Sequence, residues 1–248
     1  MRDQLLIARR HQFAVIALIT GVGLLGWIPT GSSASTSAPA LVSNLRVAPE
    51  RNAGYERDRF ADWFDADSND CDTRQEVLLR QNEKSRGACD DDRGSWFSAY
   101  DGVGVVVASE LDVDHFVPLA EAWGSGARDW TSLKRKAYSN DLYRRSLIAV
   151  TASSNRSKGD SDPSEWLPPR SGYRCRYLAN WVGVKYRWRL TLDKREKRTI
   201  KSVMSSCPTR SLLLGEIARI SDEPRRRPPV EVGNHNSLLK HSHLGGRN

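Results

Sequence analysis

The stretch from 112 to 119, Asp-Val-Asp-His-Phe-Val-Pro-Leu, constrains the fold of this chain more than any other segment. Its first residues alternate between polar and apolar, which is typical of a short, half-buried strand. The alternation places Asp112 and Asp114 on one face of the strand and Val113 on the other. A carboxylate followed directly by His115 supplies a hard oxygen ligand and a proton acceptor within one residue. We therefore expect half of a hydrolytic site here.

A second stretch, from 153 to 160, reads Ser-Ser-Asn-Arg-Ser-Lys-Gly-Asp and follows an apolar strand over 147–150. Asn155 offers another oxygen ligand. Arg156 and Lys158 offer the cations that a phosphate group needs. Together the two stretches predict a metal-dependent phosphodiesterase site.

Asp-x-Asp-His-x-Val-Pro-Leu followed by Asn-Arg-x-Lys-Gly-Asp resembles the HNH (ββα-metal) endonucleases. It is most similar to secreted bacterial HNH-family proteins that are related to the C-terminal domain of GmrSD-type restriction enzymes. The resemblance runs from Tyr55 to Cys207. It implies an α+β fold with a ββα-metal core and flanking helices. It also implies that Asp114 and Asn155 bind Mg²⁺ or another divalent metal, and that His115 is the general base at the surface.

The middle position of the HNH pattern differs from many family members, which carry an Asn nine residues before the last motif residue. Here that position is Ser146, and Asn140 lies six residues earlier. Either Ser146 makes the scaffolding hydrogen bond or Asn140 reaches in from the end of a helix. Asp112 is expected to support the site as a partner of the metal ligands.

The N-terminus has the order of a secretory signal peptide: Arg2, Arg9 and Arg10, an apolar run over 13–28, and small residues up to Ala40. The run is shorter than the roughly 20 residues of a membrane span. An uncleaved anchor is the alternative. Cleavage is expected within 32–34 or 38–40, giving a secreted protein without stable membrane association.

The rest of the chain divides into a nuclease domain over 41–220 and a basic tail over 221–248, which is expected to be disordered because it lacks apolar periodicity. Export delivers the four cysteines to an oxidising compartment, so they predict two disulfides. We favour Cys71–Cys89 and Cys175–Cys207, since each pair brackets one local unit.

The segment 65–76 matches the spacing of an EF-hand loop, which predicts a structural Ca²⁺ site. The ligands would be Asp65, Asp67, Asn69 and Glu76. Asp70 occupies the position where such loops normally need Gly. The alternative is an Asp/Asn-rich turn that caps the next helix.

The other expected elements are helices over 55–64, 76–80, 119–123 and 130–140, strands over 95–97 and 103–107, and a helix beginning at 163–166. In the helix over 130–140, Leu133, Ala137 and Tyr138 are expected to face inward. Its basic run 134–136, formed by Lys134, Arg135 and Lys136, can follow a phosphate backbone.

The C-terminal part predicts a helical hairpin closed by Cys175–Cys207. An apolar stripe marks its first helix: Tyr177, Trp181, Val184 and Trp188. Asp193 and Glu196 form a capping box that begins the second helix. Residues 170–201 hold eleven Lys and Arg against two acids, which indicates a polyanion partner.

These features favour an exported endonuclease that acts on DNA, with RNA as a second possible substrate class and with little sequence specificity. His115, Asn155 and Lys158 are its catalytic residues, and Arg156 and Lys158 contact the phosphate. The alternative is a secreted nucleic-acid-binding protein whose HNH site has lost activity. No segment indicates a protein partner.

Overall fold

The computed structural model describes residues 37–65, 68–84, 89, 92–143 and 146–214. The apolar run of the predicted signal peptide, the predicted tail and Asp67 lie outside this described part. No helix within it is long and apolar enough to cross a membrane. The first described helix, α1 (Ala38–Asn44), begins with the buried Ala38. Of the two predicted cleavage positions, 32–34 precedes α1 and 38–40 falls within it.

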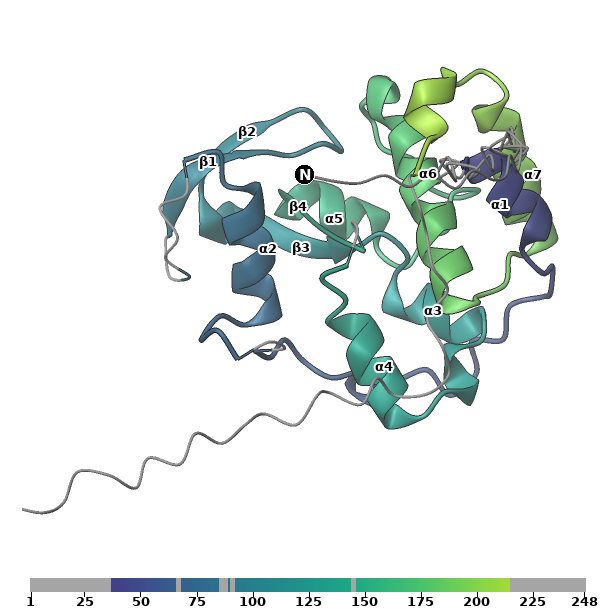
Figure 1. The fold of residues 1–248 in the computed structure, drawn as a ribbon, viewed down its shortest axis with the longest axis horizontal. Helices are drawn as coiled ribbons and strands as arrows, with labels where there is room; N and C mark the ends of the chain where they lie inside the picture. The colour runs from purple at the N-terminus through teal and green to yellow at the C-terminus, as the bar shows by residue number, and fades with distance from the viewer. Residues whose placement is uncertain (1–36, 66–67, 85–88, 90–91, 144–145, 215–248) are drawn as a thin grey trace, which may run out of the picture. The chain divides into compact units, whose positions relative to one another are not determined.

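The described residues form two antiparallel strand pairs, and the second of them carries the central motifs (Figure 1). β1 (Arg93–Phe97) pairs with β2 (Gly104–Val107). β3 (Leu111–His115) pairs with β4 (Leu147–Thr151), in full register along their length. The alternating stretch over 111–117 and its partner over 147–150 were both predicted to be strands, and both strands are present, the first ending at His115.

The helix α5 (Ala152–Lys158) follows β4 directly and lies against β3 and β4. The helix starts here because the Thr151 side chain accepts a hydrogen bond from the backbone N–H of Ser154. It ends at Gly159, whose φ of 52° suits glycine. The helix that completes the motif was predicted to begin at 163–166. This prediction was wrong, because the helix begins at Ala152 and residues 163–165 form a turn.

The other α-helices are α2 (Thr73–Gln81), α3 (Leu119–Gly124), α4 (Ser132–Ser139), α6 (Ser171–Trp188) and α7 (Lys194–Met204). Short 3₁₀ turns lie at Arg57–Arg59, Ala108–Glu110, Ala127–Asp129 and Thr209–Leu212. The fold is therefore α+β.

Two local predictions were wrong. The segment 55–64 contains only the Arg57–Arg59 turn and is otherwise without helix. Contacts with other parts of the chain hold it in this extended path. Phe60 packs against Tyr138, and the Phe64 N–H donates to the Asn140 side chain. In α4, Tyr138 is buried as predicted, but Leu133 is 66% exposed and Ala137 is also exposed.

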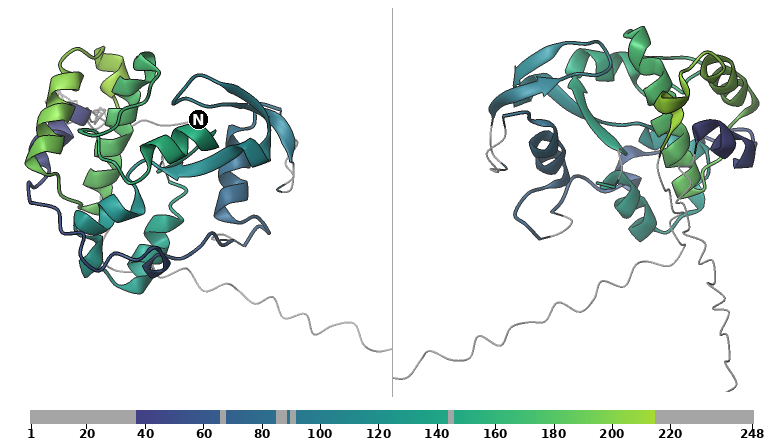
Figure 2. Two further views of the ribbon diagram at one scale, coloured as in Figure 1. Left: turned by 180° about the vertical axis from the view of Figure 1, so that it is seen from behind. Right: turned by 45° about the horizontal axis from the view of Figure 1, so that its top comes forward.

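The C-terminal hairpin agrees with its prediction. The four residues of the apolar stripe on α6 are all buried, the capping box of Asp193 and Glu196 is present, and Cys175 is bonded to Cys207. The second predicted disulfide, Cys71–Cys89, is present too. Helices α1 and α7 both pack on α6, as the two views in Figure 2 also show. This hairpin contributes to the larger core together with α1, α3 and other segments, while a smaller core lies between α2 and the strands.

Candidate functional site

The surface of β3 and α5 brings together an acid, an amide and a cation. The Asn155 Nδ2 donates a hydrogen bond to Asp112 Oδ2 at 3.0 Å. Arg156 Nε lies 3.9 Å from the same oxygen, with side-chain exposures of 78% for Arg156 and 33% for Asp112. Two consecutive positions of α5 and the partly exposed Asp112 on β3 create this arrangement. We call Asp112, Asn155 and Arg156 the outer group.

Beneath the outer group lies a buried ion pair. The ammonium of Lys158 donates to both oxygens of Asp114, each at 2.7 Å, and to the main-chain oxygen of His115 at 2.7 Å. The Tyr100 hydroxyl also donates to Asp114 Oδ2, at 2.5 Å. Burial raises the pKa of Asp114 and lowers that of Lys158, and the attraction between the two charges opposes both shifts. We call Asp114, Lys158 and Tyr100 the inner group.

The inner group decides how well the predicted metal ligands fit. Asp114 is 6% exposed, and both of its oxygens already accept hydrogen bonds. A metal on Asp114 would have to displace the Lys158 ammonium, which is 1% exposed, from its counter-ion. Separating one partner of a buried ion pair costs about 3–5 kcal/mol. Asp114 therefore does not fit the predicted role in this arrangement, whereas Asn155 remains accessible.

The burial of Lys158 also changes its predicted role. Its three N–H bonds are all used within the protein, so none points to an incoming phosphate. Arg156, the other predicted phosphate-binding residue, is exposed. The sequence motif places the two cations two residues apart, but only the helical geometry of α5 shows which of them faces solvent.

His115 is buried, not at the surface as the sequence suggested. Its ring is stacked between Trp63, 5.2 Å away, and Tyr138, 6.1 Å away, measured between ring centres. Its Nε2 lies 2.9 Å from the main-chain oxygen of Ser139. Because that oxygen can only accept, Nε2 carries the proton and Nδ1 is left as the proton acceptor.

The charge state of His115 follows from its surroundings. Burial lowers the pKa of His115 to about 4, although the bond to Ser139 favours the protonated form. The imidazole is therefore neutral at pH 7. It lines a pocket of about 40 Å³ with Arg57, Asp62 and Trp63. Alternation along β3 directs this ring to the face opposite Asp112 and Asp114, so the structure does not bring His115 to the outer group.

The two residues considered for the middle HNH position have different partners. Asn140 holds the segment around Trp63, because its side chain accepts from the Phe64 N–H and donates to the Asp62 oxygen. In this way Asn140 positions the ring that stacks on His115. Ser146 instead donates to Asp141 at 2.7 Å and accepts from Arg187 of α6 within a buried network.

Two residues that the sequence reasoning missed support the site. Tyr100 completes the inner group, and Asp101 anchors the start of α5 by accepting hydrogen bonds from the Thr151 and Ser154 hydroxyls. These bonds, together with others from Ser98 and Val103, outweigh partial burial and lower the pKa of Asp101. Both residues lie in the β1–β2 hairpin, about fifty positions before α5 in the chain. No local spacing in the sequence could have indicated them.

The basic run on α4 is used partly within the protein. Lys134 and Lys136 lie over the rings of Trp130 and Phe64, at 4.7 and 4.0 Å. Arg135 donates to the main-chain oxygens of Arg59 and Trp130. An ammonium on an aromatic face keeps its charge available to solvent, so the two lysines remain better placed than Arg135 to meet a phosphate backbone.

Part of the C-terminal positive charge is buried as well. Arg187 is 2% exposed and pairs with Asp141, and Lys185 is fully buried. Arg195 pairs with Glu165 at the surface. The predicted excess of positive charge over 170–201 therefore overstates what the folded hairpin presents to a polyanion.

Lys185 is the centre of a second buried ion cluster. It donates to Glu196 at 2.8 Å, to the Thr191 main-chain oxygen at 2.9 Å and to Glu121. Burial opposes its charge, but Glu121 and Glu196 outweigh burial and raise the pKa of Lys185. Glu50 lies beside this cluster, where burial and the charge of Glu121 raise the pKa of Glu50 to about 7.

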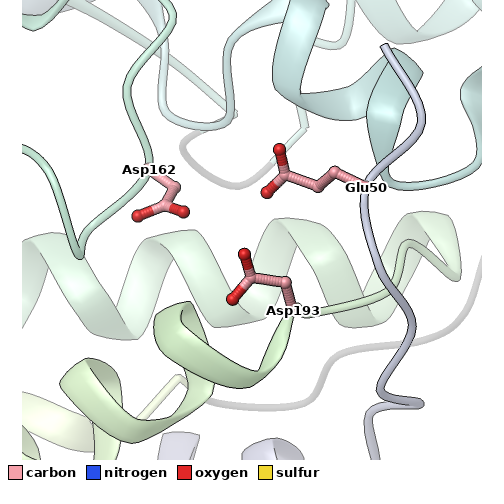
Figure 3. Close-up of side chains that lie close together, drawn as sticks. All are labelled: Glu50, Asp162 and Asp193. Atoms are coloured by element: carbon pink, nitrogen blue, oxygen red, sulfur yellow. The ribbon is translucent and has the colours of Figure 1, made fainter.

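Glu50 also faces a second set of carboxylates. Figure 3 shows Glu50, Asp162 and Asp193 converging from three segments far apart in the sequence. Their oxygens lie within 4.8 Å of one another. Asp193 is the N-cap of α7, and Asp162 accepts the backbone N–H of Ser164. Both acids therefore have a structural role in beginning the segments that follow them.

The predicted calcium loop forms a tight turn in its described part. Asp65 accepts the backbone N–H groups of Ser68, Asn69 and Asp70. Asp70 has a φ of 67°, the left-handed conformation for which such loops normally use Gly. Asn69 donates to Glu76, so two of the predicted ligands bind each other. Calcium binding remains a prediction.

Fold and site together define a disulfide-bonded α+β domain with a polar cluster on a strand pair and a helix. Residues 56–202 match the family described as GmrSD restriction endonucleases, C-terminal domain, and the chain belongs to this family. A relative from Arthroderma benhamiae, described as an uncharacterized secreted protein, is 39% identical over 199 residues. The alignment covers 78% of this chain and 97% of that relative. No solved structure matches the chain.

Proposed function

We propose that this protein is an exported, divalent-metal-dependent endonuclease. It would hydrolyse phosphodiester bonds of DNA, with RNA as the alternative substrate, and with little sequence specificity. The restriction endonuclease family and the secreted relative support this class of function. The observation that carries the proposal is the outer group, because it combines oxygen ligands with an exposed cation on one surface.

The β3–β4 pair followed by α5 is the arrangement that we propose as the ββα-metal core. Mg²⁺ is the proposed ion, and a divalent cation at such a core would stabilise negative charge on the phosphate. The predicted ligand Asp114 already accepts hydrogen bonds from Lys158 and Tyr100, so an ion bound there would have to displace these contacts. Arg156 would bind a phosphate oxygen, since its guanidinium is exposed and geometrically suited to that contact.

His115 is the proposed general base. Its tautomer leaves Nδ1 as the acceptor, and its neutral state at pH 7 allows it to take a proton. A base with a pKa of about 4 accepts a proton less readily than an exposed histidine. His115 lies on the other face of β3 from Arg156, so its ring would have to turn toward the bound phosphate for Nδ1 to reach the attacking water.

The direct experiment is cleavage of supercoiled plasmid and of circular single-stranded DNA, in Mg²⁺ and in EDTA. The disulfide-bonded protein should cut both circles in Mg²⁺ and neither in EDTA. Cleavage of a circle distinguishes an endonuclease from an exonuclease. His115→Gln should slow the reaction by about 10²–10⁴-fold. Thermal unfolding must be measured alongside, because the replaced ring is buried between Trp63 and Tyr138.

A second function is favoured by the closed state of Asp114. If the buried pair with Lys158 permanently removes that carboxylate from chemistry, the protein could bind nucleic acid without cutting it. Such a protein would retain DNA binding and fail to cleave in Mg²⁺, Mn²⁺ or Ca²⁺. The same plasmid assay therefore separates the two functions.

A further inference from the structure

Exposed apolar side chains gather on the β1–β2 hairpin. Seven large apolar side chains of the described part are exposed, and three of them lie within 97–106: Phe97 at 46%, Val103 at 46% and Val106 at 57%. On the opposite face of the hairpin, Trp96 and Val105 are buried in the smaller core. The hairpin therefore has one face that stabilises the fold and one apolar face that is open to a partner.

The turn 98–103 of this hairpin is bonded to the elements of the proposed site. Tyr100 donates to Asp114 on β3, at 2.5 Å. Asp101 accepts two hydroxyl hydrogen bonds at the start of α5. Phe97 directly precedes this turn in the chain. The exposed ring is therefore held in a fixed position beside β3 and α5.

A cation lies over this ring. The Arg170 guanidinium is 5.0 Å from the centre of the Phe97 ring, and Arg170 is exposed. Among the ion pairs of the described residues, none involves Arg170. The single acid over 93–107 is Asp101, whose carboxylate is bonded to hydroxyls of β4 and α5. The surface thus combines an aromatic ring with positive charge, which suits a partner that is flat and anionic.

A glycine opposite Phe97 leaves room beside the ring. Gly104 is the cross-strand partner of Phe97, and a Cβ added to Gly104 would meet no atom within 4 Å. Residues directly opposite each other in an antiparallel pair normally place their side chains in contact. The Phe97 ring lacks this neighbour. A glycine inside a strand often marks a position that a ligand approaches closely.

We propose that the hairpin face formed by Phe97, Gly104 and Val106, together with Arg170, binds unpaired nucleotides of the substrate strand. A base would stack on Phe97, and Arg170 would contact a phosphate. The bases of a duplex are stacked on one another, so a ring at the protein surface can stack only on unpaired bases. The inference rests on the proposed function, and it names single-stranded nucleic acid as the preferred substrate class.

The test measures binding by the full-length, disulfide-bonded protein in EDTA, so that cleavage does not interfere. Fluorescence anisotropy compares three labelled probes of equal length: a thymine oligonucleotide, the same backbone without bases, and the thymine strand in a duplex. Phe97→Ala should weaken binding of the thymine strand by at least about fivefold, as expected for the loss of one base–aromatic stack. Its affinity for the other two probes should change by less than about twofold, since neither presents an unpaired base.

Two further variants separate stacking from simple apolar contact. Phe97→Trp keeps an aromatic face and should retain the thymine-strand affinity within about twofold, whereas Phe97→Leu keeps only apolar bulk and should bind as weakly as Phe97→Ala. Arg170→Ala should weaken binding of both the thymine and the abasic strand, because its partner is a phosphate. Val47→Ala is the matched control, since it removes an exposed apolar side chain outside the hairpin and should leave all three affinities unchanged.

Equal binding of the thymine strand by the wild type and Phe97→Ala would overturn the inference. Full affinity in Phe97→Leu would also overturn it, and would assign the face to apolar contact with a protein. A dimer that is lost in Phe97→Ala while oligonucleotide binding stays unchanged would assign the face to contact between two copies of this chain. Plasmid cleavage by the wild type in Mg²⁺ is scored separately, so the nuclease function can stand while this inference fails.

Discussion

Two buried lysines occupy opposite kinds of surroundings in this protein. Lys158, on α5, has one carboxylate, Asp114, and the pair is balanced in charge. Lys185, on α6, has two carboxylates, Glu121 and Glu196, and a third, Glu50, lies within reach of both acids. One cluster is neutral and lies beneath an exposed polar group, whereas the other carries an excess of acid and lies within the main core.

The difference separates stability from function. The cluster around Lys185 joins α3, α6 and the start of α7, so it links helices that form the larger core. The pair of Lys158 and Asp114 holds α5 against β3 and leaves Asp112 and Asn155 at the surface. We therefore expect changes at Lys185 to affect folding, and changes in the outer group to affect metal binding and cleavage.

Lys185→Met should cause the largest loss of stability. The substitution leaves both Glu121 and Glu196 buried without a counter-ion. Leaving a single buried charge unpaired already costs about 3–5 kcal/mol of stability. Lys158→Met orphans only Asp114, so its effect should be smaller. Urea unfolding of both variants measures the difference. Equal losses would remove the distinction between the two clusters.

The next largest effect on stability should come from Cys175–Cys207, the disulfide that closes the hairpin containing Lys185. Cys175–Cys207 closes a loop with a sequence separation of 32, and Cys71–Cys89 one of 18. Each should contribute roughly 2–4 kcal/mol, with slightly more from the longer loop. Paired Cys→Ser variants at each bridge, followed by thermal unfolding, test this order. Free thiols in protein recovered from culture medium would contradict the predicted disulfides.

The acid excess near Lys185 should make stability depend on pH. The folded pKa of Glu50 is raised from 4.5 to about 7, so the folded state binds more protons than the unfolded state between these values. The contribution of Glu50 to stability should therefore fall as the pH rises from about 4.5 to about 7, while His115, whose pKa is lowered from 6.5 to about 4, contributes in the opposite direction between those two values. Glu50→Gln should remove the Glu50 contribution from the pH profile. A profile that is unchanged in the variant would show that Glu50 is not the group responsible.

The smallest effect concerns the basic run on α4. Lys134→Ala with Lys136→Ala should flatten the salt dependence of duplex DNA binding by at most about 1.8 in the log–log slope, since each neutralised phosphate contributes about 0.9. Scrambling the duplex sequence should leave affinity nearly unchanged. Strong preference for one sequence would argue against non-specific binding. Arg135→Ala is a useful comparison, because this side chain bonds to the main chain.

Local patterns in the sequence were sufficient for much of the fold. Alternation predicted β3, the apolar stripe predicted α6, and the spacing of Asp193 and Glu196 predicted the start of α7. Both disulfides were predicted because each cysteine pair brackets one local unit of the chain. These features depend on neighbours within a few residues or on one closing contact, so their signal is present in the sequence itself.

Local sequence patterns did not predict which of the site residues are buried. Asn155 and Lys158 lie three residues apart on α5, yet one is accessible and the other is buried. Tyr100 and Trp63 reach the site from distant segments. The assignment of α5 failed because Thr151 caps it directly after β4, leaving no turn between strand and helix. Such outcomes depend on tertiary packing, which the motif spacing does not contain.

The most direct test of the central claim compares plasmid nicking by the wild type and by Asn155→Ala in Mg²⁺. Asn155 belongs to the outer group, and its side chain is not in the core. The account predicts cleavage by the wild type and a loss of at least about 10²-fold in the variant, with little change in melting temperature. Equal cleavage by both proteins, or no cleavage by the wild type, would contradict it.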